Sequence, residues 1–125
     1  MAATRPPRIW IAELRVVIVH PDGRRAPGHI AVGQPYTLGG ADPAGSYESH
    51  CPVQFDGIHS RVHPIIGGGT LQALLLAVQF LGTMLHDFIS RGGRVLDPED
   101  DSDVPLAALF GPMLRESNAP ENGAA

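Results

Sequence analysis

The sequence has no lysine and a single cysteine, and these two scarcities narrow the classes of function. All nine basic residues are arginines, they are scattered along the chain, and the formal net charge is −4. A protein that binds nucleic acid needs basic side chains clustered on one surface, where they neutralise phosphates. We therefore expect no nucleic-acid partner.

The single cysteine, Cys51, excludes an internal disulfide framework and a cysteine-rich zinc site. A free thiol is typical of the reducing cytoplasm. The N-terminal stretch MAATRPPRIW contains no apolar run long enough for a secretory signal peptide. These features together predict a cytoplasmic protein.

One long uncharged segment could be either a membrane span or a buried core helix. Residues 65–85 contain no charged side chain, and a helix of that length can span a bilayer. Consecutive glycines lie near its start, and Gln72, Gln79 and Thr83 place polar groups along it. These interruptions favour a buried core helix, so we expect no membrane partner.

The length of 125 residues is that of one domain. Composition predicts a disordered N-terminus at 1–8, a folded domain at 9–96, and an acidic linker with a partly apolar, largely irregular tail at 97–125. Periodicity and turn residues predict strands and one long helix, with Thr70 as the expected N-cap. The predicted strands cover 9–19, 29–36, 47–55, 58–65 and 94–96, and the predicted helix covers 71–90.

These elements predict an α+β fold, with a four- to five-stranded, largely antiparallel sheet and one long helix packed on one face. In the first strand, Trp10 is expected to share the face that meets the helix with the alternate residues that follow it. On the helix, Leu76, Phe80 and Met84 widen the apolar side beyond one face. We interpret these three residues as a candidate partner surface, with coverage by residues 104–114 as the alternative.

The stretch HCPVQFDGIHSRVH, residues 50–63, combines the cysteine with three histidines. The Asp-Gly pair at its centre is a strong signal for a hairpin with a two-residue turn. That turn would place Cys51 on the core side of the sheet. It would also set His50 directly opposite His63 on the other side.

Two opposed histidines could bind a metal ion. Directly opposed residues in an antiparallel pair have Cβ atoms about 4.5–5.5 Å apart, which allows two imidazoles to share a metal. Glu48, two residues from His50 on the same face, is a third candidate ligand beside His50 and His63. A solvated polar face explains the same residues without a metal, so both interpretations stay open. No other cofactor is predicted.

Other patterns give weaker signals. The GGGT stretch at 67–70 could hold an anion before the helix, but it lacks the lysine and the spacing of a phosphate loop. The acidic run at 97–103 lacks the glycine and the closing glutamate of an EF-hand, and Ala108 stands where that glutamate would be. We recognise no carboxylate–histidine–nucleophile spacing, so we expect a non-enzymatic protein.

Three short matches, in chain order, resemble a small bacterial domain family of unknown function. Ile-Ala-Glu at 11–13 and Gly-Gln-Pro at 33–35 match its first two strands, and GGGTLQALLLA at 67–77 matches its helix entry, G-x-D-S-x-Q-A-L-x-L-A. Gly69 replaces the family's aspartate, and Ser49 stands where tryptophan is usual. The resemblance implies a small α+β domain with an antiparallel sheet and one helix, and it implies no activity.

The main hypothesis is a non-enzymatic cytoplasmic domain for protein–protein interaction, such as an accessory or immunity-type protein. Its support is the absence of catalytic and cofactor motifs together with the broad apolar side of the predicted helix. We expect an unidentified protein partner, with a homodimer as one form of that contact. A metal-binding protein that uses the cross-strand histidine pair is the alternative function.

Overall fold

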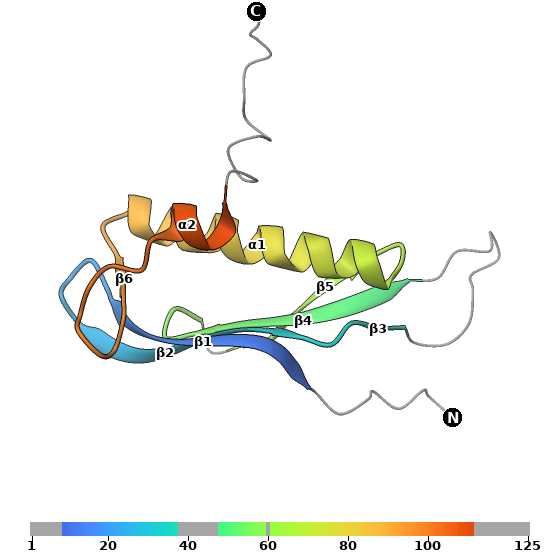
Figure 1. The fold of residues 1–125 in the computed structure, drawn as a ribbon, viewed down its shortest axis with the longest axis horizontal. Helices are drawn as coiled ribbons and strands as arrows, with labels where there is room; N and C mark the ends of the chain where they lie inside the picture. The colour runs from blue at the N-terminus through green and yellow to red at the C-terminus, as the bar shows by residue number, and fades with distance from the viewer. Residues whose placement is uncertain (1–8, 38–47, 60, 112–125) are drawn as a thin grey trace, which may run out of the picture.

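A computed structural model describes residues 9–37, 48–59 and 61–111, and in these residues one sheet carries one long helix on one face (Figure 1). The predicted disorder at 1–8 and the tail beyond 111 lie outside the described residues. The elements are β1 (Trp10–Val19), β2 (Arg25–Gly33), β3 (Tyr36–Thr37), β4 (Ser49–Asp56), β5 (His63–Gly67), α1 (Thr70–Ser90), β6 (Arg94–Leu96) and α2 (Leu106–Phe110). This arrangement confirms the predicted α+β class.

All the paired strands are antiparallel, as predicted. The order along the sheet is β3-β4-β2-β1-β6, and β5 pairs with β4. The sheet has six strands rather than four or five, because the short strand β3 continues along β4 beyond the end of β2. Since α1 follows β5 and precedes β6, it carries the chain from one edge of the sheet to the other.

The core lies between α1 and the sheet. From the sheet it contains Val16, Ile18, Ile30, Val32, Cys51, Val53, Phe55 and Val95, and from α1 it contains Ala73, Ala77, Leu81 and Leu85. The four helix residues are spaced four apart, so they form one row along the side of α1 that meets the sheet. The two alanines in this row allow a close approach, and α1 makes most of its contacts with β4 and β5.

Cys51 lies in this core, as predicted, and its side chain is fully buried. Its thiol donates a hydrogen bond to the carbonyl oxygen of Gly33, with 3.3 Å between the sulfur and the oxygen. Burial raises the pKa of the Cys51 thiol to about 11, because the thiolate would lose its hydration. The thiol is therefore protonated at neutral pH and acts as a small apolar side chain.

The start of α1 differs from the prediction. Gly69, not Thr70, is the N-cap residue, and no side chain caps it. The side-chain oxygen of Gln72 instead accepts a hydrogen bond from the backbone N–H of Gly68. Just before this turn, a Cβ added to Gly67 would lie 2.6 Å from the backbone nitrogen of Ala73. The absence of a side chain at Gly67 is therefore what lets the end of β5 pack against the first turn of α1.

The first strand contains a β-bulge that the alternating pattern did not reveal. The register of β1 with β2 shifts between Trp10 and Ala12, so that Trp10 pairs with Gly33. A bulge inserts one residue and reverses the alternation of side chains beyond it. Trp10 therefore faces away from α1, and the prediction that it shares the core face is wrong. Its ring contacts the edge of the His29 imidazole on the open face, with 6.0 Å between ring centroids.

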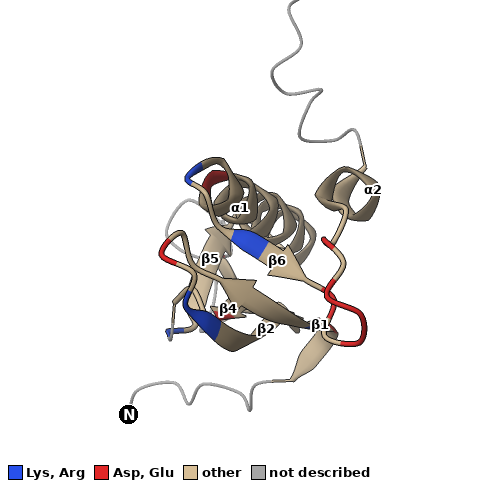
Figure 2. Cartoon of the chain, turned by 90° about the vertical axis from the view of Figure 1, so that its left-hand side faces the viewer, with Lys and Arg blue, Asp and Glu red and all other residues tan. Residues whose placement is uncertain are grey.

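Charged residues are concentrated away from α1 (Figure 2). The figure shows acidic and basic residues in the turns at one end of the sheet and in the segment after β6. Within α1, Asp87 is the sole charged residue. The helix therefore presents an apolar surface on the side away from the sheet as well as towards it.

Candidate functional site

The hairpin between β4 and β5 has a different register from the one predicted by its Asp-Gly pair. His63 lies opposite Val53, and His50 lies opposite Ile66. The carbonyl oxygen of Phe55 accepts hydrogen bonds from the two N–H groups at positions 58 and 59, so the chain turns more widely than a two-residue turn. The predicted pairing of His50 with His63 is wrong by three residues, and an odd shift moves a side chain to the other face of the sheet.

His63 consequently points towards the core. Its imidazole stacks on the ring of Phe55, with 5.4 Å between centroids and 16° between planes. The ring of Phe80 from α1 lies 6.0 Å from it, and the ring of His59 lies 5.9 Å from it at an angle of 87°. Nε2 of His63 is buried, and no group of the described residues hydrogen-bonds to it. His63 thus packs among aromatic rings in this structure.

His50 lies on the open face of the sheet, where its ring stacks on Tyr36 at a centroid distance of 5.4 Å. Its Nε2 lies 3.3 Å from a carboxylate oxygen of Glu48. These contacts retain the predicted proximity of His50 and Glu48, but the sheet separates both from His63. Within the described residues, no three histidine, cysteine, aspartate or glutamate side chains are grouped to hold a metal ion. The structure therefore does not bring the three predicted ligands together.

A second histidine–carboxylate contact on the open face was not predicted. Nε2 of His29 donates a hydrogen bond to a carboxylate oxygen of Glu13, with 2.6 Å between the two atoms. The His29 side chain is largely buried, whereas the Glu13 side chain is half-exposed. Glu13 and His29 lie near each other through the register of β1 with β2, which a single sequence does not reveal. Trp10 packs against the same imidazole, so this contact anchors the N-terminal part of β1.

The predicted partner surface of α1 divides between the core and the exterior. Phe80 and Met84 are half-buried and pack against the core cluster. Leu76 is 36% exposed. Phe80 reaches the core through Phe55, with 5.9 Å between their ring centroids. The predicted stripe is therefore in large part a packing surface of the domain itself.

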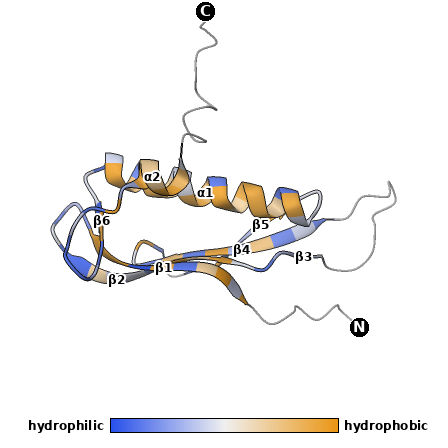
Figure 3. Cartoon of the chain, in the orientation of Figure 1, coloured by the Kyte–Doolittle hydropathy of each residue, from blue (hydrophilic) through white to orange (hydrophobic). Residues whose placement is uncertain are grey.

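Three other exposed apolar side chains of α1 lie on a different stripe. Leu71 is 67% exposed, Leu75 is 53% exposed and Ile89 is 37% exposed. Positions 71 and 89 are five helical turns apart and 71 and 75 are one turn apart, so the three point in similar directions. Figure 3 shows apolar residues along the whole of α1, including the side that faces away from the sheet. We call Leu71, Leu75 and Ile89 the outer stripe.

The segment after β6 docks beside α1. Val104, Leu106 and Phe110 are half-buried against the core cluster, and α2 contacts α1. The backbone N–H of Val104 donates to the carbonyl oxygen of Val95 in β6, which fixes the path of the segment. The segment thus packs beside α1 over residues 104–110, and residues 112–114 of the predicted range lie outside the described residues.

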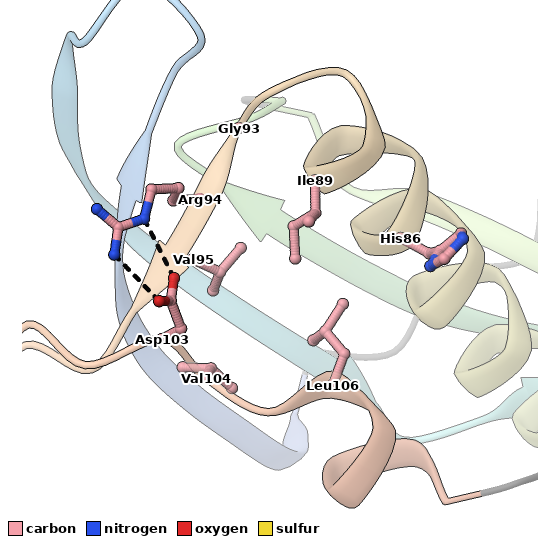
Figure 4. Close-up of a pocket in the computed structure, with 8 residues that line it drawn as sticks. All are labelled: His86, Ile89, Gly93, Arg94, Val95, Asp103, Val104 and Leu106. Atoms are coloured by element: carbon pink, nitrogen blue, oxygen red, sulfur yellow. Dashed lines mark hydrogen bonds and ion pairs between the residues drawn. The ribbon is translucent and has the colours of Figure 1, made fainter.

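A cleft of about 320 Å³ lies between α1, β6 and this docked segment (Figure 4). Its lining residues are His86, Ile89, Gly93, Arg94, Val95, Asp103, Val104 and Leu106. Figure 4 shows Ile89, Val95 and Leu106 pointing into the same space, with Arg94 and Asp103 joined at one side. Ile89 belongs to both the cleft and the outer stripe, whereas Leu71 and Leu75 lie on the first turns of α1, away from the cleft.

The ion pair at the side of the cleft is bidentate. Nε and Nη2 of Arg94 donate to the two carboxylate oxygens of Asp103, at 3.2 and 3.0 Å. The guanidinium lowers the pKa of the Asp103 carboxyl group. Both side chains are more than half-exposed, so water screens the pair and its contribution to stability is small. The pair gives the apolar cleft a polar border of fixed geometry.

Helix α1 is long and apolar enough to cross a membrane, and 28% of its most apolar window is buried. By length and composition alone this is weak support for a membrane span, because the core helix of a globular domain can meet the same criteria. Here α1 packs against β4 and β5 along one side. Most of that window of α1 is therefore at least partly exposed.

Comparison with known proteins gives no assignment. No family model, curated protein sequence or solved structure matches the chain. The resemblance of its helix entry to a bacterial domain family therefore stays a prediction.

Proposed function

We propose that this protein is a non-enzymatic interaction domain that binds another protein through the outer stripe of α1 and the adjoining cleft. One observation carries the proposal: large apolar side chains, Leu71 and Leu75 above all, are exposed on a helix that packs on the sheet along one side only. Contiguous apolar residues on a surface are typical of protein-binding sites.

The chemistry of this surface indicates what kind of partner surface would complement it. No charged residue lies between Thr70 and His86, so the surface offers no ionic contact over most of its length. A partner that complements it needs apolar side chains at helical spacing, which an amphipathic helix of another protein supplies. We therefore propose helix-against-helix docking, with the partner's apolar stripe against Leu71, Leu75 and Ile89.

The cleft gives such a helix an anchor point. Its apolar walls include Ile89, Val95 and Leu106, and its volume of about 320 Å³ accommodates one large apolar side chain. Burial of an anchor side chain contributes about 2 kcal/mol, and central anchors of this kind dominate the affinity of many interfaces. The bidentate Arg94–Asp103 pair at its border can accept polar contacts from the edge of the partner.

An accessory role follows from this proposal. A domain that binds through a preformed apolar surface can mask a partner or hold it in place, and an immunity-type protein acts in that manner. We propose this role as the specific form of the interaction function. A toxin encoded beside the gene would favour it.

Site-specific photocrosslinking in the native host tests the proposal. A photoreactive residue at Leu75 should form a covalent adduct with one protein, whereas the same residue at Ser90, an exposed position on a polar part of α1, should not. The captured protein, once purified, should bind the wild-type chain and should bind a Leu71→Asp variant at least about tenfold more weakly. Equal adducts at both positions, or unchanged affinity for the Leu71→Asp variant, would contradict the proposal.

A further inference from the structure

The edge of β1 is covered along only part of its length. β6 pairs with Val17, Ile18 and Val19, at the end of β1 near the β1–β2 turn. Among the described residues, no strand pairs with the Ala12–Val16 part of β1 on that side. Figure 2 shows the short β6 beside one end of β1 while the rest of β1 extends past it. Such an open edge is a template for pairing with another strand.

The hydrogen bonds of the neighbouring strand show which backbone groups are available. The N–H of His20 donates to the carbonyl oxygen of Arg24. The register that sets Val19 opposite Arg25 also sets His20 opposite Arg24, so His20 and Arg24 are a hydrogen-bonded pair. In an antiparallel pair, alternate residues bond to one neighbour and the intervening residues point to the other side. The even-numbered residues of β1 therefore bond to β2, and Glu13 and Arg15 direct their N–H and C=O groups to the open edge.

We propose that two copies of this chain pair antiparallel through β1, with Leu14 of each copy on the two-fold axis. Glu13 then lies opposite the partner's Arg15, and Arg15 lies opposite the partner's Glu13. Because both residues point to the open edge, each opposed pair exchanges two N–H···O bonds. The same register brings a carboxylate and a guanidinium together across the interface at both pairs.

The alternation of charge selects this register over its neighbours. A register shifted by two residues would place Glu13 opposite the partner's Glu13, or Arg15 opposite the partner's Arg15. Like charges directly opposite each other in an antiparallel pair are destabilising, whereas opposite charges are stabilising. Both side chains belong to exposed residues, so they are accessible to a second copy.

The residues between and beside these charges are compatible with the same pairing. Leu14, which is half-buried, would lie opposite the partner's Leu14 on the helix side of the sheet. Ala12, which is exposed, would lie opposite the partner's Val16. Apolar contacts on one face would thus accompany ionic contacts on the other, as is typical of a strand pair with one buried face.

The β-bulge explains where this pairing ends. In the proposed register the partner's Ile11 would reach the position opposite Val17, which Leu96 of β6 already occupies. The register shift between Trp10 and Ala12 bends β1 just before that point. The two strands can therefore pair over Ala12–Val16 and then diverge, which makes the interface short and specific.

A charge-reversal experiment with wild-type chain and two variants tests the proposal. Light scattering coupled to size exclusion should give the wild-type chain a mass twice its 13.2 kDa at high concentration. Arg15→Glu leaves two glutamates on the edge and Glu13→Arg leaves two arginines, so each variant alone should dimerise at least about tenfold more weakly. An equimolar mixture of the two variants should recover the dimer, because each opposed pair then combines opposite charges.

Controls separate this interface from other sites. Arg24→Glu reverses a charge in the β1–β2 turn and should leave the dimer intact, and Leu75→Asp, on the outer stripe of α1, should also leave it intact. Since Glu13→Arg removes the contact with His29, circular dichroism must show that both variants are folded, and Arg15→Gln offers a milder second variant. A wild-type chain that is monomeric at every concentration would overturn the proposal, and so would a mixture that stays monomeric. Neither result bears on the outer stripe of α1.

Discussion

The imidazole of His63 lies nearly parallel to the ring of Phe55, at a centroid distance of 5.4 Å, while its buried Nε2 atom has no hydrogen-bond partner within residues 9–37, 48–59 and 61–111. The stacking gives His63 the position of an aromatic core residue. A buried nitrogen that loses its hydrogen bond to water on folding, with no replacement from the described residues, is unfavourable.

Replacement of His63 by phenylalanine should therefore stabilise the protein. The variant keeps the ring that packs on Phe55 and Phe80 and removes the unpartnered nitrogen, so we expect the free energy of unfolding to rise by about 1 kcal/mol. Urea denaturation followed by circular dichroism measures the change. His50→Phe is the control, because His50 stacks on Tyr36 and contacts Glu48 at the surface, and it should bring no gain. A loss of stability in His63→Phe would show that Nε2 has a partner in solution.

Because the thiol of Cys51 is buried, we expect it to be alkylated slowly, and we expect the free energy of unfolding to fall at alkaline pH. Its pKa is raised from 9.0 to about 11, so the native thiol ionises at higher pH than the unfolded one. The corresponding stabilisation is fully present below pH 9 and is lost as the pH rises towards 11. Alkylation by iodoacetamide at pH 8 should be slow in the native protein and fast in urea. A native rate equal to that of the unfolded chain would contradict the burial of Cys51.

Gly67 should not tolerate even a methyl group. In Gly67→Ala the new Cβ would lie 2.6 Å from the backbone nitrogen of Ala73 and 2.9 Å from its Cα, so β5 or α1 must shift. We expect a loss of about 2 kcal/mol in the free energy of unfolding. Gly69→Ala is the matched control, because its Cβ would meet no atom within 4 Å. Thermal denaturation of the two variants should therefore separate them, and equal melting temperatures would contradict the close packing.

Substitutions on the two sides of α1 should differ in their effect on the free energy of unfolding. Leu75→Glu lies on the outer stripe and should change the free energy of unfolding by less than about 0.5 kcal/mol, whereas Ala77→Leu overpacks the core and should cost about 2 kcal/mol. The native wild-type chain should also bind an apolar dye such as anilinonaphthalene sulfonate, and Leu75→Glu should weaken the fluorescence. Strong destabilisation by Leu75→Glu would mean that the stripe is covered in solution.

The sequence predicted the elements of the fold better than their registers. Alternation and helical spacing depend on neighbouring residues, and they identified the long helix, its antiparallel sheet and the burial of Cys51. The β4–β5 register depends on contacts between distant residues, and here the Asp-Gly signal was misleading. One feature of the sequence favours the observed register. In the predicted pairing Pro64 would lie opposite Ser49, where the ladder needs an N–H that proline lacks, whereas in the observed pairing it lies opposite Pro52.

The most exposed stripe of α1 was not predicted, for a related reason. When almost every side of a helix is apolar, periodicity does not distinguish the side that meets the sheet from the side that stays exposed. Phe80 and Met84 have large apolar side chains, and a large apolar residue is as suitable for a core as for an interface. Small residues were the better signal, because Ala73 and Ala77 mark the side where α1 approaches the sheet. Similarly, the bulge at Trp10 has no local signature in the sequence.

The pairing of β6 with β1 has a consequence for how the chain is made. Val19 lies opposite Arg94, so the last strand of the sheet completes a contact with the first. During synthesis β1 and β2 leave the ribosome early, but this edge of the sheet cannot close until residues 94–96 have emerged as well. Pairing between segments so distant in sequence is slow to form. Until then the nascent chain exposes a longer edge of β1 together with the apolar surface of α1, and a chaperone has its main opportunity to bind during that interval.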